Sequence, residues 1–260
     1  FAAENFIATP HLGASTVEAQ EKVALQVAEQ MADYLATGAV TNAINMASVT
    51  AEEAPLLKPY MILGGLLGRF LGQLDTKGLT AVKLEFEGKA AGLNEQPILA
   101  SALAGVLGPQ MDSVNMVNAA ALAHNNDIAV SIVRHDRRCD YESLLRLTLS
   151  HKGGERTVCG TLVGGDKARL VEVQGISVES AFPENMLYLR NYDKPGFIGA
   201  LGTMMGDLGV NIATFHLGRK EAGGEAVALV EIDGAVTHDT LQAIRDMTQV
   251  VRADYLQFSA

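Results

Sequence analysis

A histidine near the start of the chain stands in a segment that is a candidate for proton transfer. His11 follows a proline and precedes a leucine in the segment TPHLGAST, which covers residues 9–16. An imidazole with an ordinary pKa of about 6.5 can supply a proton at neutral pH, so the segment is a candidate acid–base site. The alternative is that His11 is a structural residue.

A second group of polar residues surrounds a predicted turn near the other end of the chain. Asp193 precedes the run Lys-Pro-Gly, and Asn211 is the second residue of the next predicted strand. The helix predicted between them would supply free backbone N–H groups at its N-terminus, close to Gly196. Asp193, Gly196 and Asn211 are therefore candidates for contact with a small polar ligand. The alternative is that Asp193 is a turn residue and Asn211 a strand-edge cap.

Other residues that could carry chemistry fit known patterns poorly. His135, Cys139, His151 and Cys159 have none of the usual spacings of zinc ligands, so no metal site is predicted. No GxGxxG motif occurs, and the stretch 160–167 fails as a phosphate-binding loop because an aspartate stands where the lysine belongs. Two cysteines are too few for a disulfide framework, which favours a reducing, cytoplasmic setting.

The charge and hydropathy of the chain argue against nucleic acid and membrane partners. The net charge of -10 would repel a phosphate backbone and an anionic lipid surface. The most apolar run, Met61 to Leu74, is interrupted by glycines and an arginine and falls short of the ~20 residues that a membrane-spanning helix needs. We therefore expect this run to be a packed core helix.

The first residues predict a helix that would follow the His11 segment. Ser15 and Glu18 have the spacing of a capping box, and Gly38 is a typical helix stop. Apolar residues recur between them at helical spacing and predict one buried face: Val23, Val27, Met31, Tyr34 and Leu35. A second helix is predicted over residues 56–74 despite Pro59, with glycines that permit close packing.

The middle of the chain reads as a mixed domain. Strands are predicted over residues 80–88, 128–135, 144–151, 157–163 and 168–174, and helices over 97–107 and 117–126. Glycine pairs at 153–154 and 164–165 mark turns between the last three strands, which predicts consecutive antiparallel strands.

The last part of the chain gives the clearest pattern. Strands are predicted over residues 186–191, 210–220, 225–233 and 250–258, with helices over 195–209 and 238–247. Pro195 would enter the first helix and Gly209 would close it. Met204 and Met205 on this helix are expected to fill the core or a dimer contact. The order βαββαβ is that of a ferredoxin-like domain.

This last segment resembles the ACT family over about 70 residues, most clearly in DKPGFIGALGTMMGDLGVNI at residues 193–212. The resemblance implies a small effector, often an amino acid, bound where the first strand meets the first helix at a subunit interface. In serine-sensing relatives the contact positions correspond to Asn191, Asp193 and Asn211 here. It therefore implies L-serine as the effector, with Gly196 at the helix end, and dimerisation through the ACT domains.

The segment TPHLGAST resembles the catalytic-histidine segment of the D-2-hydroxyacid dehydrogenases. In that family the histidine, paired with an upstream glutamate, supplies the proton that a carbonyl needs when it receives hydride. The resemblance implies that His11 is the acid–base residue and that Leu12, Gly13 and Ala14 lie beside the nicotinamide of NAD, where Gly13 permits close approach. The family's glutamate, substrate-binding arginine and GxGxxG turn lie upstream. We therefore expect the chain to start within a longer protein and to be inactive by itself.

The order of the segments resembles the long-form D-3-phosphoglycerate dehydrogenases. The expected fold is α+β: the tail of a Rossmann-type dehydrogenase over residues 1–45, an intervening domain over 46–185, and an ACT domain over 186–260. Arg169 matches a basic position of a possible anion site in the intervening domain. The resemblance implies oxidation of 3-phosphoglycerate with NAD in L-serine biosynthesis, by a homo-oligomer that is a dimer or tetramer. The alternatives are a free-standing amino-acid-binding module and another ACT-bearing 2-hydroxyacid dehydrogenase.

Overall fold

The computed structural model describes residues 4–74, 77–136 and 139–258. The chain divides into two compact units, Phe1–Leu56 and Leu57–Ala260. The second unit contains two β-sheets, one of six strands and one of four. The expected mixed α+β class is confirmed.

Helix α1 dominates the first unit and spans Val17–Thr37. Its N-cap is Thr16, whose side chain accepts a hydrogen bond from the Ala19 N–H at 3.2 Å. The predicted capping box of Ser15 and Glu18 is therefore wrong, because the N-cap lies one residue later and Ala19 occupies the position where the box needs Glu or Gln. Gly38 ends the helix with a left-handed φ of 80°, as predicted. The predicted buried face is wrong for this structure, because no residue of α1 is buried. The spacing of apolar residues shows which face of a helix can pack, but it does not show whether another element packs against that face.

The first sheet of the second unit has the order β2-β1-β3-β4-β5-β6. Its strands are β1 (Leu79–Gly88), β2 (Ala129–His135), β3 (Ser143–His151), β4 (Gly154–Val163), β5 (Lys167–Val173) and β6 (Ile176–Ser180). Strands β1 and β2 are parallel, and the other neighbours are antiparallel, which confirms the predicted antiparallel run. Strand β6 was not predicted, because five residues are too few for a clear alternation.

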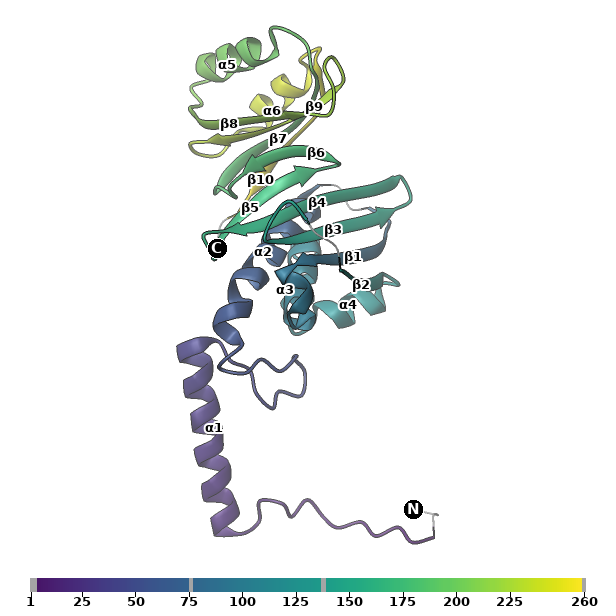
Figure 1. Cartoon of the computed structure of the whole chain (residues 1–260), viewed down its shortest axis with the longest axis vertical. Helices are drawn as coiled ribbons and strands as arrows, with labels where there is room; N and C mark the ends of the chain where they lie inside the picture. Colours follow the sequence, from purple (N-terminus) through teal and green to yellow (C-terminus); the bar gives the residue numbers. More distant parts are fainter. Residues whose placement is uncertain (1–3, 75–76, 137–138, 259–260) are drawn as a thin grey trace. The chain divides into compact units, whose positions relative to one another are not determined.

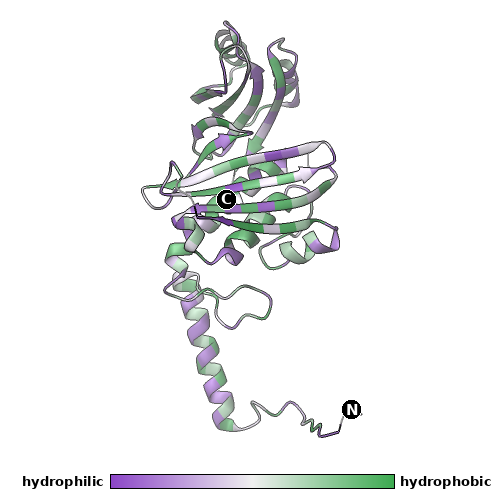
Figure 2. Cartoon of the chain, turned by 45° about the vertical axis from the view of Figure 1, so that its right-hand side comes forward, coloured by the Kyte–Doolittle hydropathy of each residue, from purple (hydrophilic) through white to green (hydrophobic). Residues whose placement is uncertain are grey.

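Helices cover one face of this sheet (Figure 1). They are α2 (Ala54–Gln73), α3 (Glu95–Leu107) and α4 (Ala119–Asn125), and a short 3-10 turn, η1, covers Lys89–Gly92. Helix α2 contains Pro59 and contributes Leu63, Leu67 and Phe70 to the core, each fully buried. Apolar and polar residues alternate along the strands (Figure 2), as expected of a sheet with one covered face.

Glycines bring α2 and α3 into backbone contact. A Cβ atom at Gly68 would lie 3.0 Å from the Val106 nitrogen and closer still to the Ala102 carbonyl oxygen. Gly72 and Gly105 are as tightly enclosed by the backbone of the facing helix. The predicted close packing is therefore confirmed, and the α2–α3 contact leaves no room for a side chain at these positions.

The second sheet belongs to a domain with the order β7-α5-β8-β9-α6-β10. Its elements are β7 (Asn185–Tyr192), α5 (Phe197–Asp207), β8 (Ile212–Arg219), β9 (Glu225–Ile232), α6 (His238–Arg245) and β10 (Val250–Gln257). The strand order β10-β7-β9-β8, with antiparallel neighbours throughout, is the predicted ferredoxin-like arrangement. Met205 is buried in its core, and Met204 packs against that core.

The two sheets of the second unit are tied together by direct contacts. The Gln73 side chain exchanges two hydrogen bonds with the backbone of Gln257, at 3.0 and 2.8 Å. The Phe70 ring meets the Tyr188 ring edge-on at a centroid distance of 5.4 Å. Strands β6 and β8 approach so closely that a Cβ atom at Gly218 would overlap the Ser177 carbonyl oxygen.

Candidate functional site

A pocket of 340 Å³ lies where β7 leads into α5. Its wall combines the end of β7, the turn 193–196, the first turn of α5 and the end of β8, with these lining residues: Asn191, Asp193, Lys194, Pro195, Gly196, Phe197, Ile198, Gly199, Leu217 and Arg219. The turn is set by Gly196, whose φ of 92° favours glycine. Helix α5 begins at Phe197, after the N-cap Gly196, so Pro195 precedes the helix and does not open it.

The Asp193 carboxylate is fixed at the edge of this pocket. Its Oδ2 atom accepts a hydrogen bond from the Gly223 N–H at 3.0 Å. The same atom forms an ion pair with Arg219 Nη1 at 2.6 Å. The Gly223 hydrogen bond, helped by Arg219, lowers the pKa of the Asp193 carboxyl below its ordinary value. The group is therefore ionised at neutral pH and can accept an ammonium group.

Asn191 presents a buried acceptor without a partner. Its side chain is 1% exposed, and its Nδ2 atom donates to the Tyr192 carbonyl at 3.1 Å. Among the described residues the Oδ1 atom has no hydrogen-bond partner, and the opposite amide orientation would set Oδ1 against the Tyr192 carbonyl oxygen. An unsatisfied buried acceptor costs about 1–3 kcal/mol, so this amide at the pocket wall is held in an unfavourable state.

The N-terminus of α5 adds donors to the same pocket. The first N–H groups of any α-helix lack an intrahelical partner and carry part of its positive dipole. The Phe197 N–H donates to the Lys194 carbonyl at 3.4 Å, and Ile198 and Gly199, the next two residues of the helix, line the pocket. The pocket thus combines the Asp193 carboxylate and the Asn191 amide with a helix N-terminus, a set that suits a small zwitterion.

The structure does not bring Asn211 to this pocket. Asn211 lies after the C-terminal end of α5, and its Nδ2 atom donates to Asp233 Oδ2 at 2.7 Å. Of the four residues predicted to bind the effector, the pocket of a single chain therefore includes three: Asn191, Asp193 and Gly196. Sequence reasoning missed Arg219, whose only sequence signal is its place at the end of a strand, 26 residues from Asp193.

Two protein-family models match the chain. One is the D-3-phosphoglycerate dehydrogenase intervening domain over residues 56–174, and the other is the ACT domain over residues 185–248. This chain carries both of those domains. The pocket described above is therefore part of an ACT domain, and the six-stranded sheet is that of the intervening domain.

Similar curated proteins carry the name D-3-phosphoglycerate dehydrogenase. The chain is 32% identical to the one from Bacillus subtilis, over 94% of this chain and 47% of that protein. It is 33% identical to the one from Methanocaldococcus jannaschii, over 95% and 47%, and 34% identical to the one from Synechocystis, over 92% and 44%. The chain thus spans about half the length of these relatives and matches their C-terminal portion.

Arg169 lies in a second cavity, of 380 Å³, between the intervening and ACT domains. Its neighbours there include His216 and two carboxylates, Glu179 and Glu231. Because the two carboxylates outnumber the single guanidinium, the cavity opposes a doubly charged anion. The Arg169 Nη1 atom donates to the Ala168 carbonyl at 3.1 Å, a contact that serves the local fold.

The His11 segment is exposed and irregular. His11, Leu12, Gly13 and Ala14 are all exposed, and the segment turns through a hydrogen bond from the Ser15 N–H to the Leu12 carbonyl at 3.1 Å. Within the described residues the His11 ring has no hydrogen-bond or ion-pair partner. Among the residues that the structure describes, no carboxylate therefore orients the His11 ring.

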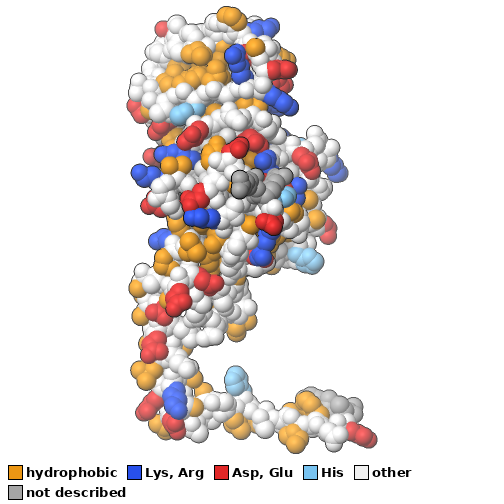
Figure 3. Space-filling view, in the orientation of Figure 1, with side chains coloured by type: hydrophobic (Ala, Val, Ile, Leu, Met, Phe, Trp, Pro, Cys, Tyr) orange, Lys and Arg blue, Asp and Glu red, His pale blue; other side chains and the backbone are white. Residues whose placement is uncertain are grey.

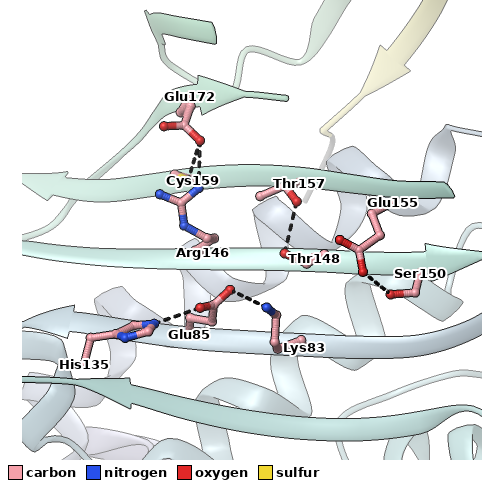
Figure 4. A network of polar contacts seen from close by, with 10 residues as sticks. All are labelled: Lys83, Glu85, His135, Arg146, Thr148, Ser150, Glu155, Thr157, Cys159 and Glu172. Atoms are coloured by element: carbon pink, nitrogen blue, oxygen red, sulfur yellow. Dashed lines mark hydrogen bonds and ion pairs between the residues drawn. The ribbon is translucent and has the colours of Figure 1, made fainter. Parts of the chain in front are cut away.

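The four histidine and cysteine residues considered as zinc ligands have other partners. His135 Nε2 lies 2.8 Å from Glu85 Oε1, and the sulfur of Cys159 lies 3.4 Å from Glu172 Oε1 (Figure 4). Burial raises the pKa of the Cys159 thiol, so that thiol is a poor nucleophile. The Cys139 thiol donates to the Tyr141 carbonyl, and His151 Nδ1 accepts from the Gly153 N–H at 3.1 Å.

Within the described ranges, no helix is both long and apolar enough to cross a lipid bilayer.

Proposed function

We propose that this chain is the regulatory C-terminal portion of an NAD-dependent D-3-phosphoglycerate dehydrogenase and that its ACT domain senses L-serine. The whole enzyme would oxidise 3-phospho-D-glycerate to 3-phosphohydroxypyruvate, the first step of L-serine synthesis, in the cytoplasm. The observation that carries the sensing role is the pocket between β7 and α5, with its ionised Asp193, its Asn191 amide and its helix N-terminus.

The proposed domain limits follow the sequence. Residues 1–45 would end the dehydrogenase region, 46–185 would form the intervening domain and 186–260 the ACT domain.

The residues from His11 to Ala14 would lie beside the nicotinamide, while the upstream part of the enzyme would hold most of NAD. His11 would give a proton to the substrate carbonyl, or take one from the alcohol, as hydride moves to or from the nicotinamide.

We propose that Asn211 reaches the site from a second copy of the chain. Within one chain it lies beyond the opposite end of α5 from Asp193, so a pocket with all three polar residues needs another subunit. Figure 3 shows hydrophobic side chains gathered on the ACT surface near α5. Ile198 in α5 and Leu208 at its C-cap are exposed hydrophobic residues. An exposed apolar face of this kind suits a dimer contact, and two such dimers would make the expected tetramer.

Replacing Asp193 or Asn211 by alanine is expected to weaken L-serine binding about 5- to 150-fold, which corresponds to about 1–3 kcal/mol per lost charge-assisted hydrogen bond. Titration calorimetry of the 260-residue chain with L-serine, glycine and L-alanine measures the effect. Asp239→Ala is the matched control, because this aspartate is fully exposed at the start of α6 and does not line the pocket. The sensing role would be refuted if L-serine released no more heat on titration than L-alanine does. It would also be refuted if both variants bound L-serine with the affinity of the wild type.

A further inference from the structure

Arg219 is one of two cationic residues that line the ACT pocket, and it is not among the serine contacts proposed above. It stands at the end of β8, and its side chain is 56% exposed. Its Nη1 atom lies 2.6 Å from Asp193 Oδ2. The guanidinium is therefore held at the pocket mouth by a residue that itself lines the pocket.

The Asp193–Arg219 ion pair leaves binding capacity on both partners. Both hydrogen bonds to Asp193 reach Oδ2, and within the described residues Oδ1 has no partner. A guanidinium carries five N–H donors in a planar fork, and this contact uses one nitrogen. An ammonium group on Oδ1 and a carboxylate on the free edge of Arg219 can thus be bound without breaking the pair.

The other cationic side chain that lines the pocket, Lys194, contacts an aromatic ring. The Lys194 ammonium lies over the Tyr192 ring, 5.7 Å from its centroid, where the electrons of the ring attract it. A planar guanidinium also matches the two oxygens of a carboxylate better than an ammonium group does. Arg219 is therefore the side chain of this pocket best suited to a carboxylate.

We propose that Arg219 is a specificity-determining residue that binds the α-carboxylate of the amino acid while Asp193 binds its ammonium group. This assignment rests on the proposed sensing function. In the ion pair, the Arg219 guanidinium and the Asp193 carboxylate are separated by one nitrogen–oxygen contact of 2.6 Å. The ammonium and carboxylate groups of an α-amino acid are also adjacent, so each can bind its opposite charge on the protein. The pocket would favour α-amino acids over amines that lack a carboxylate.

The test compares L-serine with ethanolamine, which keeps the ammonium group and the hydroxymethyl arm and lacks the carboxylate. In Arg219→Gln the affinity for L-serine is expected to fall roughly 10- to 150-fold, while that for ethanolamine stays equal or rises. Arg219→Lys keeps the charge without the planar fork and should show an intermediate loss. The matched control is Arg190→Gln, which removes another ion-paired arginine of the ACT sheet, bound to Glu225 and outside the pocket. Its affinity for L-serine should be that of the wild type.

Each outcome of the calorimetry has a distinct meaning. Loss of serine affinity in Arg219→Gln, with the ethanolamine affinity retained, supports the assignment. Unchanged or tighter serine binding in Arg219→Gln overturns it and leaves the sensing function intact, because Arg219 would then be neutral or would block Asp193. Equal losses for both ligands also overturn it, since the variant would have damaged the ammonium site. A wild-type chain that binds no amino acid overturns the sensing function together with this assignment.

Discussion

Replacing His11 by alanine in the complete enzyme is expected to lower kcat about 10²- to 10⁴-fold, the usual loss when a positioned acid–base group is removed. The carbonyl that receives hydride must also receive a proton, and the alanine side chain cannot supply one. Substrate binding should change less, because other residues hold the substrate. Steady-state kinetics of the wild-type and variant enzymes measure kcat and KM separately.

His238→Ala is the control for this experiment. His238 is an exposed histidine at the start of α6 in the ACT domain, so its loss should leave kcat unchanged. The 260-residue chain by itself should show no dehydrogenase activity, since the proposed cofactor fold lies outside it. A His11→Ala enzyme with near-normal kcat would assign His11 a structural role.

The second large effect is expected at the α2–α3 contact, where Gly68→Ala should lower the free energy of unfolding by about 1–3 kcal/mol. The added methyl group would overlap the Ala102 carbonyl oxygen, so the two helices would have to separate. The higher helix propensity of alanine, worth about 1 kcal/mol, offsets part of this cost. Urea unfolding of the chain, followed by circular dichroism, measures the difference.

Gly202→Ala in α5 provides the matched comparison. Gly202 is also a helical glycine, but a Cβ atom there would have no neighbour within 4 Å. Alanine should therefore leave the free energy of unfolding unchanged or raise it by up to about 1 kcal/mol. If both variants are equally stable, the close backbone contact between α2 and α3 is wrong.

Local patterns were enough to predict most of the secondary structure. The ACT strands and helices are confirmed to within a few residues, because alternating and helical apolar spacing, with glycines between, depends only on neighbouring residues. The Gly38 helix end is confirmed for the same reason. The boundary errors are local too: Thr16 replaces Ser15 as the N-cap of α1, since two adjacent hydroxyl residues offer similar caps.

The residues around the ACT pocket were predicted only in part. Asn191, Asp193 and Gly196 lie within six residues of one another, so one strand end and one turn bring them together. Arg219 joins them only because β8 and the turn at Gly223 fold back beside Asp193. Asn211 was grouped with them on resemblance, and the length of α5 separates it from the pocket in a single chain.

The sequence by itself determined the order of the ACT elements, their ends to within a few residues and the turn that places Asp193 before a helix, because each depends on the conformational preferences of a few adjacent residues. Only the tertiary structure decided that Gly68 meets Ala102, that Arg219 pairs with Asp193 and that the Asn191 amide is buried with no partner for its oxygen among the described residues. These contacts join residues distant in the chain, or depend on what surrounds a side chain. They form only when the packed core selects one arrangement of the elements.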